Sequence, residues 1–278
     1  MFGSEWLYLK LYGAGAWQEN LIMYYISQFT DDMLCKKKID KYFFMRYVDP
    51  EFHIRLRIHS KNIMMYITDI TNWLGELCTQ GVISRYEIGC YEREVERYGG
   101  LYGIEIAENI FYEDSRIAEK MLRMIKENKL HFEQELVGVL SAIFYMDQFG
   151  WNFSQQLDWL NSFIDKTDYK AEYSKVRKEY ETVCNDNDNW SSLREREDGP
   201  LLIEMFNRRE NFVKAYRKAI REGIITTSEE TIIASLIHLS FNRLFGINRE
   251  FERKILSFTR HALYSLRYQK EHKNEIRI

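Results

Sequence analysis

Two short segments alternate strictly between apolar and polar side chains, and this alternation constrains the fold more than any other feature. In residues 6–12, WLYLKLY, a leucine occupies every second position. In residues 53–59, HIRLRIH, isoleucine and leucine alternate with histidine and arginine. A period of two is the repeat of a β-strand with one buried face. Both segments are therefore predicted to be strands of a half-buried sheet.

Helical periods and turn residues complete the pattern of the N-terminal part. Asp49-Pro50 favours a turn, which predicts a hairpin between the strands on either side of it. The resulting order, β-α-β-β-α-β, is that of a ferredoxin-like fold. Strands are expected at 6–12, 42–48, 53–59 and 82–91, and helices at 17–30 and 61–79.

After RYGGLYG, residues 97–103, the apolar spacing becomes helical. We therefore predict an α+β protein with a ferredoxin-like sheet part at 1–100 and a mainly helical part at 101–278. The two parts are expected to form one integrated domain over 1–278. Helices are expected at 104–112, 115–127, 130–148, 154–165, 168–184, 200–222, 227–244 and 248–270, with a polar loop at 184–200.

Composition excludes several classes of protein. The net charge of −3 argues against direct nucleic-acid binding, which ordinarily leaves a basic footprint. The four cysteines lack CxxC spacing and the six histidines lack HExxH spacing, so no metal site is expected. Neither a signal peptide nor a membrane span is predicted from the sequence, so we expect a cytoplasmic protein with reduced thiols.

The polar face of the strand at 53–59 is cationic. A hairpin across residues 49–52 would place Arg46 opposite Arg55, and three arginines including Arg57 would share one face. Like charges opposed across a hairpin destabilise it, so a partner of opposite charge is required. Solvent with nearby acids is one explanation. A binding site for a carboxylate or phosphate is the other, because a guanidinium group bonds two oxygens at once.

Two further clusters carry polar groups. CYEREVERYGG, residues 90–100, contains Glu94 and Arg97, and it fits a solvated, salt-bridged surface as well as a site. Its paired glycines predict an unusual backbone conformation or a close approach of another group. SLIHLSFNRLFG, residues 235–246, places His238 on an apolar helix face, where a buried structural histidine is the commoner case. Asn242 and Arg243, one turn later, make that face more polar than a core requires.

Together these clusters carry a resemblance to a known family. RYVDPEFHIRLRI, YEREVERYGG and HLSFNRLFG, with WLYLKLYG near the start, resemble the C-terminal elimination domain of class I lanthipeptide dehydratases. Proteins described as thiopeptide-type bacteriocin biosynthesis proteins are similar to the same domain. The resemblance implies a carbon-oxygen lyase. Such an enzyme expels glutamate from glutamylated Ser or Thr of a precursor peptide and leaves dehydroalanine or dehydrobutyrine.

The resemblance also implies roles for residues. By motif, the family's essential residues correspond to Arg55, Arg57, Glu94, Arg97 and His238. His238, Arg97 and Glu94 are expected to be catalytic, and histidine ordinarily exchanges protons near neutral pH. The arginines are expected to stabilise the departing carboxylate as an oxyanion hole does. Substrate binding is expected from Arg55, Arg57, Arg46, Asn242 and Arg243.

The resemblance implies no metal and no organic cofactor, and it implies a ribosomally made precursor peptide as partner. Because the chain has no room for a glutamylation domain, a separate glutamyl-tRNA-dependent component is expected, with this chain as a stand-alone elimination enzyme. A homodimer stays open. Two alternatives also stay open: a thiopeptide pyridine synthase that performs a formal aza-[4+2] cycloaddition, and a non-catalytic subunit that binds the precursor peptide.

Overall fold

The computed structural model describes residues 5–185 and 189–275. The chain divides into two compact units, each with its own core. Unit 1 comprises Met1–Glu127 and Leu239–Ile247, and unit 2 comprises Asn128–His238 and Asn248–Ile278. The protein is α+β, and the four strands found in these described residues all lie in unit 1.

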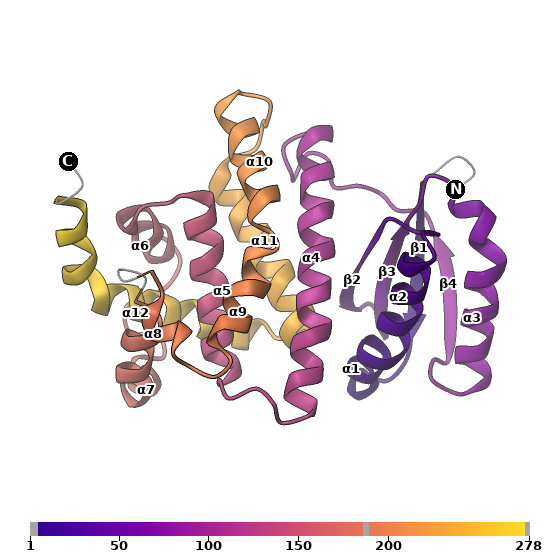
Figure 1. Cartoon of the computed structure of the whole chain (residues 1–278), viewed down its shortest axis with the longest axis horizontal. Helices are drawn as coiled ribbons and strands as arrows, with labels where there is room; N and C mark the ends of the chain where they lie inside the picture. Colours follow the sequence, from indigo (N-terminus) through magenta and orange to yellow (C-terminus); the bar gives the residue numbers. More distant parts are fainter. Residues whose placement is uncertain (1–4, 186–188, 276–278) are drawn as a thin grey trace. The chain divides into compact units, whose positions relative to one another are not determined.

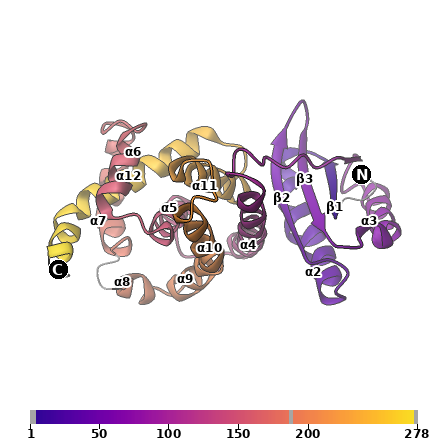
Figure 2. The same ribbon diagram turned by 90° about the horizontal axis from the view of Figure 1, so that it is seen from above.

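A four-stranded antiparallel sheet is the framework of unit 1 (Figures 1 and 2). The strands are β1 Trp6–Tyr12, β2 Lys41–Val48, β3 Phe52–His59 and β4 Arg85–Gly89, in the order β2-β3-β1-β4. In the N-terminal part, the predicted succession of strands and helices is observed. Alternate residues of β1 and β3 are fully buried, as the period of two predicted.

Helices follow β1 and β3. Three segments run on without interruption from residue 18 to residue 35: α1 Gln18–Asn20, the π-helical turn η2 Leu21–Ile26, and α2 Ser27–Cys35. After β3 come η3 Ile63–Tyr66 and α3 Ile67–Thr79, and the short η1 Gly15–Trp17 precedes α1. Phe29 of α2 stacks on Trp73 of α3 at 4.1 Å between ring centroids, so these two helices lie side by side.

The predicted register of the β2–β3 hairpin is wrong by one residue. Val48 pairs with Phe52, so the loop contains three residues, and Met45 rather than Arg46 stands opposite Arg55. Because successive side chains of a strand point to opposite faces, this shift moves Arg46 to the face opposite that of Arg55 and Arg57. The expected face with three arginines therefore contains two.

One long helix, α4 Leu101–Lys126, replaces the two helices expected at 104–112 and 115–127. It lies along β2 and carries unit 1 past the boundary expected at residue 100 (Figure 1). The hydroxyl of Ser115 accepts the backbone N–H of Phe44 at 3.2 Å, which occupies a donor on the open edge of β2.

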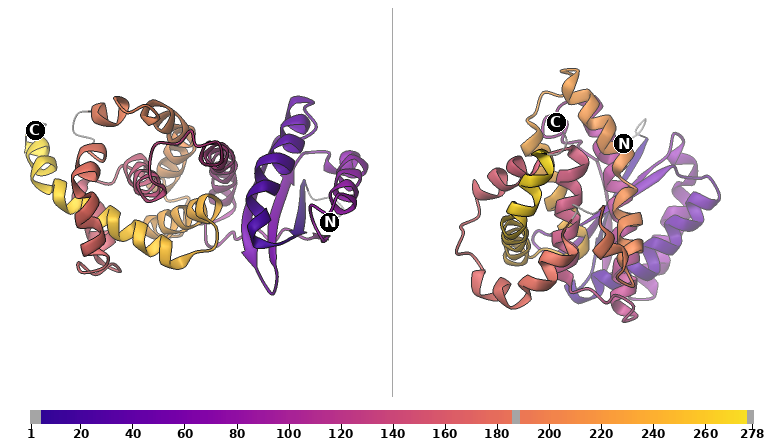
Figure 3. Two further views of the ribbon diagram at one scale, coloured as in Figure 1. Left: turned by 90° about the horizontal axis from the view of Figure 1, so that it is seen from below. Right: turned by 60° about the vertical axis from the view of Figure 1, so that its left-hand side comes forward.

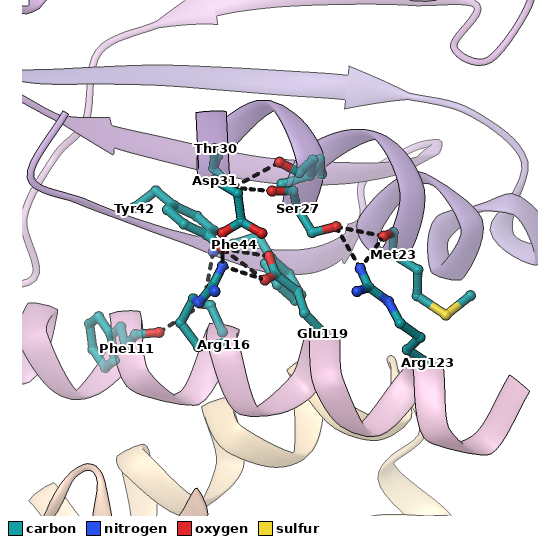
Figure 4. A network of polar contacts seen from close by, with 12 residues as sticks. Met23, Ser27, Thr30, Asp31, Tyr42, Phe44, Phe111, Arg116, Glu119 and Arg123 are labelled. Atoms are coloured by element: carbon teal, nitrogen blue, oxygen red, sulfur yellow. Dashed lines mark hydrogen bonds and ion pairs between the residues drawn. The ribbon is translucent and has the colours of Figure 1, made fainter. Parts of the chain in front are cut away.

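A buried polar network fixes α4 further along (Figure 4). The Tyr42 hydroxyl lies 2.7 and 2.8 Å from the two carboxylate oxygens of Glu119, and Arg116 also bonds Glu119 and Asp31. Arg123 Nη2 donates to the Met23 carbonyl at 2.9 Å. That carbonyl belongs to the π-helical turn, in which the backbone N–H of residue 27 bonds Ile22 instead.

Unit 2 is helical. The predicted helix at 200–222 is two helices, because the chain turns at Arg209, whose buried guanidinium lies 3.5 Å from the centroid of Tyr145. The expected loop at 184–200 contains a short helix, and its residues 186–188 lie outside the described part. The helices are α5 Gln134–Phe149, α6 Phe153–Asn161, α7 Lys170–Val183, α8 Ser191–Arg194, α9 Gly199–Asn207, α10 Glu210–Arg221, α11 Glu229–Phe245 and α12 Arg249–Glu275. Of α11, the residues from Leu239 on belong to unit 1.

The C-terminal helix organises this unit. α12, yellow in Figure 3, packs on α5, α6 and α7. Gly138 of α5 makes room for Ile255 of α12, since a Cβ at residue 138 would lie 2.7 Å from the Ile255 side chain. Over residues 5–185 and 189–275, none of the helices is both long and apolar enough to cross a membrane.

Candidate functional site

The four basic residues of β3 lie in different environments. His53 is buried, donates from Nδ1 to the Glu51 carbonyl at 2.9 Å, and has its pKa lowered chiefly by burial. His59 lies 3.1 Å from the Asp40 carboxylate and 3.3 Å from that of Glu5. Both histidines therefore have hydrogen-bond partners within the protein. The arginines between them, Arg55 and Arg57, are the residues of this strand that could bind an anion.

Arg55 is half-buried at the hairpin end of β3. Its guanidinium lies 3.3 Å from the centroid of the Tyr47 ring, and its Nε donates to His53 Nε2 at 3.3 Å. Since His53 Nδ1 already donates to a carbonyl, Nε2 is the acceptor of this contact. Arg55 is thus oriented by an aromatic face and an imidazole, and no carboxylate of the described residues is among its hydrogen-bond partners.

Arg57 is buried among aromatic rings. Its guanidinium carbon lies 4.8 Å from the centroid of Tyr8, 5.2 Å from that of Phe43 and 4.9 Å from that of Tyr91. These distances are within the range of cation–π attraction. The side chain is 8% exposed, and within the described residues its Nε and Nη1 find no hydrogen-bond acceptor.

A buried cation without an acceptor is costly. Burial lowers the pKa of Arg57, and the neighbouring guanidinium groups of Arg55 and Arg243 lower it further, although Tyr91 and Tyr8 act in the opposite direction. Unpaired buried charge is ordinarily avoided unless a partner arrives. A bound anion would supply the missing acceptors, since a guanidinium group can bond both oxygens of a carboxylate.

Aromatic contacts connect Arg57 to two more arginines of unit 1. The Phe43 ring lies 5.2 Å from Phe111 of α4, and the guanidinium of Arg243 lies 5.0 Å from the same Phe111 ring. Tyr98 contacts Phe111 at 5.3 Å, and Arg97 lies 5.9 Å from the Tyr98 centroid. We call this set the arginine–aromatic cluster; its members are Arg57, Arg97, Arg243, Tyr8, Phe43, Tyr91, Tyr98 and Phe111.

A partly buried ion pair connects the segment before α4 to that helix. Arg93 donates from Nε and Nη2 to the two carboxylate oxygens of Glu108, both at 2.7 Å, and that carboxylate is almost fully buried. Gly99 and Gly100 have φ values of 80° and 112°, which confirms the expected unusual backbone. Glu94 and Arg97 form an exposed pair at 3.3 Å, so Arg97 stays accessible beside the cluster.

Arg46 and Asn242 serve the edge of the sheet. The Asn242 side chain accepts the backbone N–H of Arg46 at 2.9 Å and donates to its carbonyl at 3.0 Å. The Arg46 side chain is buried and contacts the Leu244 carbonyl and Glu19. These contacts join α11 to β2, and the expected role of Arg46 and Asn242 in substrate binding stays a prediction.

In unit 2, His238 is paired with a carboxylate. Its Nδ1 lies 2.9 Å from each of the two carboxylate oxygens of Glu252 in α12. The side chains are 31% and 19% exposed respectively, so the pair is partly shielded from water. His238 is therefore not the buried structural histidine that is commonest on an apolar helix face. Its environment is typical of a histidine whose imidazole is oriented by a carboxylate.

Several residues of these environments were not identified from the sequence. Tyr98 stands beside Arg97 in the motif, so a search for aromatic neighbours of the arginines could have found it. Glu252 lies 14 residues from His238 but in the next helix, so the periodicity of a single helix could not have indicated it. Among residues 5–185 and 189–275, no group of three or more His, Cys, Asp or Glu side chains could hold a metal ion.

Comparison with known proteins places these environments in context. Residues 6–263 match the family described as lantibiotic biosynthesis dehydratase C-term. The subtilin biosynthesis protein SpaB of Bacillus subtilis is 38% identical over 270 residues, which are 96% of this chain and 26% of that protein. The chain therefore spans about a quarter of that relative.

Two solved structures are similar in fold to this chain. The tRNA-dependent lantibiotic dehydratase MibB from Microbispora sp. 107891 has a TM-score of 0.86 at 25% identity, over 96% of this chain and 28% of MibB. The pyridine synthase TbtD from thiomuracin biosynthesis shares the fold, with a TM-score of 0.64 at 10% identity over 95% of this chain and 99% of TbtD. With a match across nearly the whole sequence, the chain belongs to the C-terminal family of lantibiotic biosynthesis dehydratases.

Proposed function

We propose that this chain removes glutamate from glutamylated Ser or Thr residues of a precursor peptide, which leaves dehydroalanine or dehydrobutyrine. The observation that carries the proposal is Arg57. A buried guanidinium with two N–H-bearing nitrogens lacking an acceptor, in a chain of a dehydratase family, is suited to stabilise a departing carboxylate.

The reaction is a β-elimination. A base removes the proton from Cα of the modified residue, and the electron pair of that bond forms the Cα–Cβ double bond. The Cβ–O bond breaks at the same time, and glutamate leaves with the electron pair of the Cβ–O bond on its carboxylate. Negative charge thus grows on an oxygen that begins as a neutral ester, and fixed positive charge stabilises this transition state more than the substrate.

We assign the carboxylate of the leaving group to Arg57, with Arg243 and Arg97 as further positive charge of the arginine–aromatic cluster. A glutamyl group carries a second carboxylate and an ammonium as well. Arg55 and Glu94 are proposed to bind these groups, since one is cationic and the other anionic. The aromatic rings hold Arg57 in position without consuming its N–H groups.

We propose His238 as the group that transfers the proton. Its Nδ1 faces Glu252, and its Nε2 makes no hydrogen bond within the described residues. A neutral imidazole with a lone pair on Nε2 can accept a proton and later return it.

The remaining expectations stay proposals. We propose a precursor peptide as partner, a separate glutamyl-tRNA-dependent component as supplier of the ester, and work in the cytoplasm, where the four free cysteines would stay reduced. We also propose that the antiparallel sheet, with its order β2-β3-β1-β4, is a ferredoxin-like unit, and that both units act as one integrated domain.

The direct test uses the purified chain and a synthetic peptide that carries one glutamylated serine. Mass spectrometry should show loss of glutamate, and addition of a thiol to the product should prove that dehydroalanine rather than serine was formed. His238→Ala and Arg97→Ala should leave the ester uncleaved. Arg85→Gln is the matched control, because Arg85 lies on the same face of the sheet but is exposed and paired with Glu87.

Two outcomes would contradict the proposal. If the peptide is bound but remains intact through long incubation, the chain is a peptide-binding subunit. If it instead converts a peptide with two dehydroalanines into a cyclised product, it is a pyridine synthase. Unchanged elimination by the His238 and Arg97 variants would refute the roles assigned to those residues. The proposed reaction itself would stand.

A further inference from the structure

The His238–Glu252 pair is a contact between ionisable side chains that the sequence did not predict. Both carboxylate oxygens of Glu252 lie 2.9 Å from the same nitrogen, Nδ1. A carboxylate has no proton to donate, so the hydrogen of this contact belongs to Nδ1. The two side chains come from α11 and α12, which follow one another across the short connection that includes Gly246.

The start of α12 places this carboxylate. Asn248 precedes the helix and its side chain accepts the backbone N–H of Phe251 at 3.0 Å, as an N-cap does. Glu252 then falls in the first turn, where the helix dipole favours a negative charge. Glu250 occupies the same turn but is exposed, so the two acids share the backbone environment and differ in their contact with His238.

The contact determines which nitrogen of the imidazole carries the proton. With the hydrogen on Nδ1 held by Glu252, the lone pair of the neutral ring lies on Nε2. When Nε2 takes up a proton, the ring becomes cationic, and the adjacent carboxylate stabilises that charge. A carboxylate that holds a histidine in this way is a positioning group, because it need not touch the substrate.

We infer that Glu252 is the positioning residue of this chain's proton-transfer histidine: it fixes His238 in the tautomer with a free Nε2 and stabilises the protonated ring. This inference rests on the proposed function for its consequence in the reaction. The tautomer itself is a property of the protein without substrate, and it can be measured separately.

The experiment compares wild type with Glu252→Gln and Glu250→Gln. Long-range ¹H–¹⁵N correlation spectra, recorded at a pH where the imidazoles are neutral, report the tautomer, and His238→Gln identifies the His238 signal. Wild type and Glu250→Gln should carry the proton on Nδ1. A glutamine at position 252 can donate its amide N–H to Nδ1, so Glu252→Gln should shift the proton to Nε2.

The same three proteins are then given the glutamylated peptide. Glu252→Gln should eliminate glutamate about 10–100-fold more slowly, whereas Glu250→Gln should match wild type. A wild-type His238 protonated on Nε2 would overturn the inference, and so would a Glu252→Gln protein with an unchanged tautomer and rate. If wild type eliminates no glutamate, the proposed function fails, while the spectra still decide the role of Glu252.

Discussion

Arg57 and Arg116 are cations of the same unit with opposite surroundings. Arg116 lies among hydrogen-bond acceptors, two of which are carboxylates: it bonds Glu119, Asp31 and the Tyr42 hydroxyl (Figure 4). Arg57 is surrounded by rings and has nitrogens without an acceptor. The difference teaches that unit 1 pairs an arginine with carboxylates where α4 is anchored. It leaves a buried arginine without a carboxylate partner where an anion is proposed to bind.

The pKa values express the same contrast. Burial alone would lower the pKa of Arg116, but Tyr42, Glu119 and Asp31 raise it overall. For Arg57 burial prevails, and the pKa is lowered. The guanidinium of Arg57 remains charged at neutral pH all the same, because arginine titrates far above it. Its charge therefore persists at an energetic cost that a bound carboxylate would reduce.

The largest expected effect comes from exchanging each arginine for methionine. Arg57→Met should slow elimination about 10²–10³-fold, as removal of an oxyanion-hole donor does, with unfolding stability unchanged or higher. Arg116→Met should leave elimination unchanged and lower the free energy of unfolding by about 2 kcal/mol, since Glu119 stays buried without its cation. Product formation and urea denaturation measure the two effects, and the reverse result would remove the contrast between the two sites.

A smaller effect is expected from Tyr42→Phe. The variant loses the hydroxyl that bonds both oxygens of Glu119, and about 1–2 kcal/mol of unfolding free energy should go with it. Elimination should be unaffected. Tyr102→Phe is the control, because that hydroxyl belongs to an exposed residue of the same helix. Equal stability of the two variants would show that the network in Figure 4 contributes nothing measurable.

The pH dependence of stability sharpens the comparison further. Burial raises the pKa of Glu119 from its ordinary 4.5 to about 7, although the Tyr42 hydrogen bond and Arg116 lower it. Between these values the folded protein binds more protons than the unfolded chain, so stability falls as pH rises. The slope should be at most about 1.4 kcal/mol per pH unit. Glu119→Gln should flatten this slope, and Glu105→Gln, at an exposed position of α4, should not.

The smallest effect is expected from free glutamate as a ligand. A carboxylate that binds beside Arg57 should stabilise the folded protein by about 0.4 kcal/mol when its concentration equals its Kd. Thermal unfolding at rising glutamate concentration measures this stabilisation. Glutamine in place of glutamate tests the contribution of the side-chain carboxylate. Arg57→Met should abolish the stabilisation and Arg116→Met should retain it. Equal stabilisation of both variants would locate the anion elsewhere.

The sequence predicted the elements better than their pairing. The alternation of apolar residues in β1 and β3 was sufficient for the strands, because it reports the buried face directly. The register failed at Arg46, because the length of a turn decides which face a side chain occupies, and a shift of one residue reverses it. The single helix α4 and the break at Arg209 depend on tertiary contacts that local spacing does not contain.

The residues of the proposed site show the same limit. Arg55, Arg57, Glu94, Arg97 and His238 were named from motifs, and they remain proposals. Their surroundings could not be read from the sequence: aromatic rings of β1, β2 and the segment after β4 pack around Arg57, and Glu252 reaches His238 from the next helix. Contacts between distant segments arise from packing, which periodicity does not encode.

The bonds between Asn242 and the backbone of Arg46 have a consequence for biosynthesis. The two partners are separated by 196 positions, so a growing chain contains β2 long before it contains the amide that occupies its edge. Until then the strand presents an open N–H and C=O to any other extended chain nearby. Completion of this sheet therefore waits for a late segment of the nascent polypeptide, and the interval is when a chaperone or a tightly coupled translation rate would matter most.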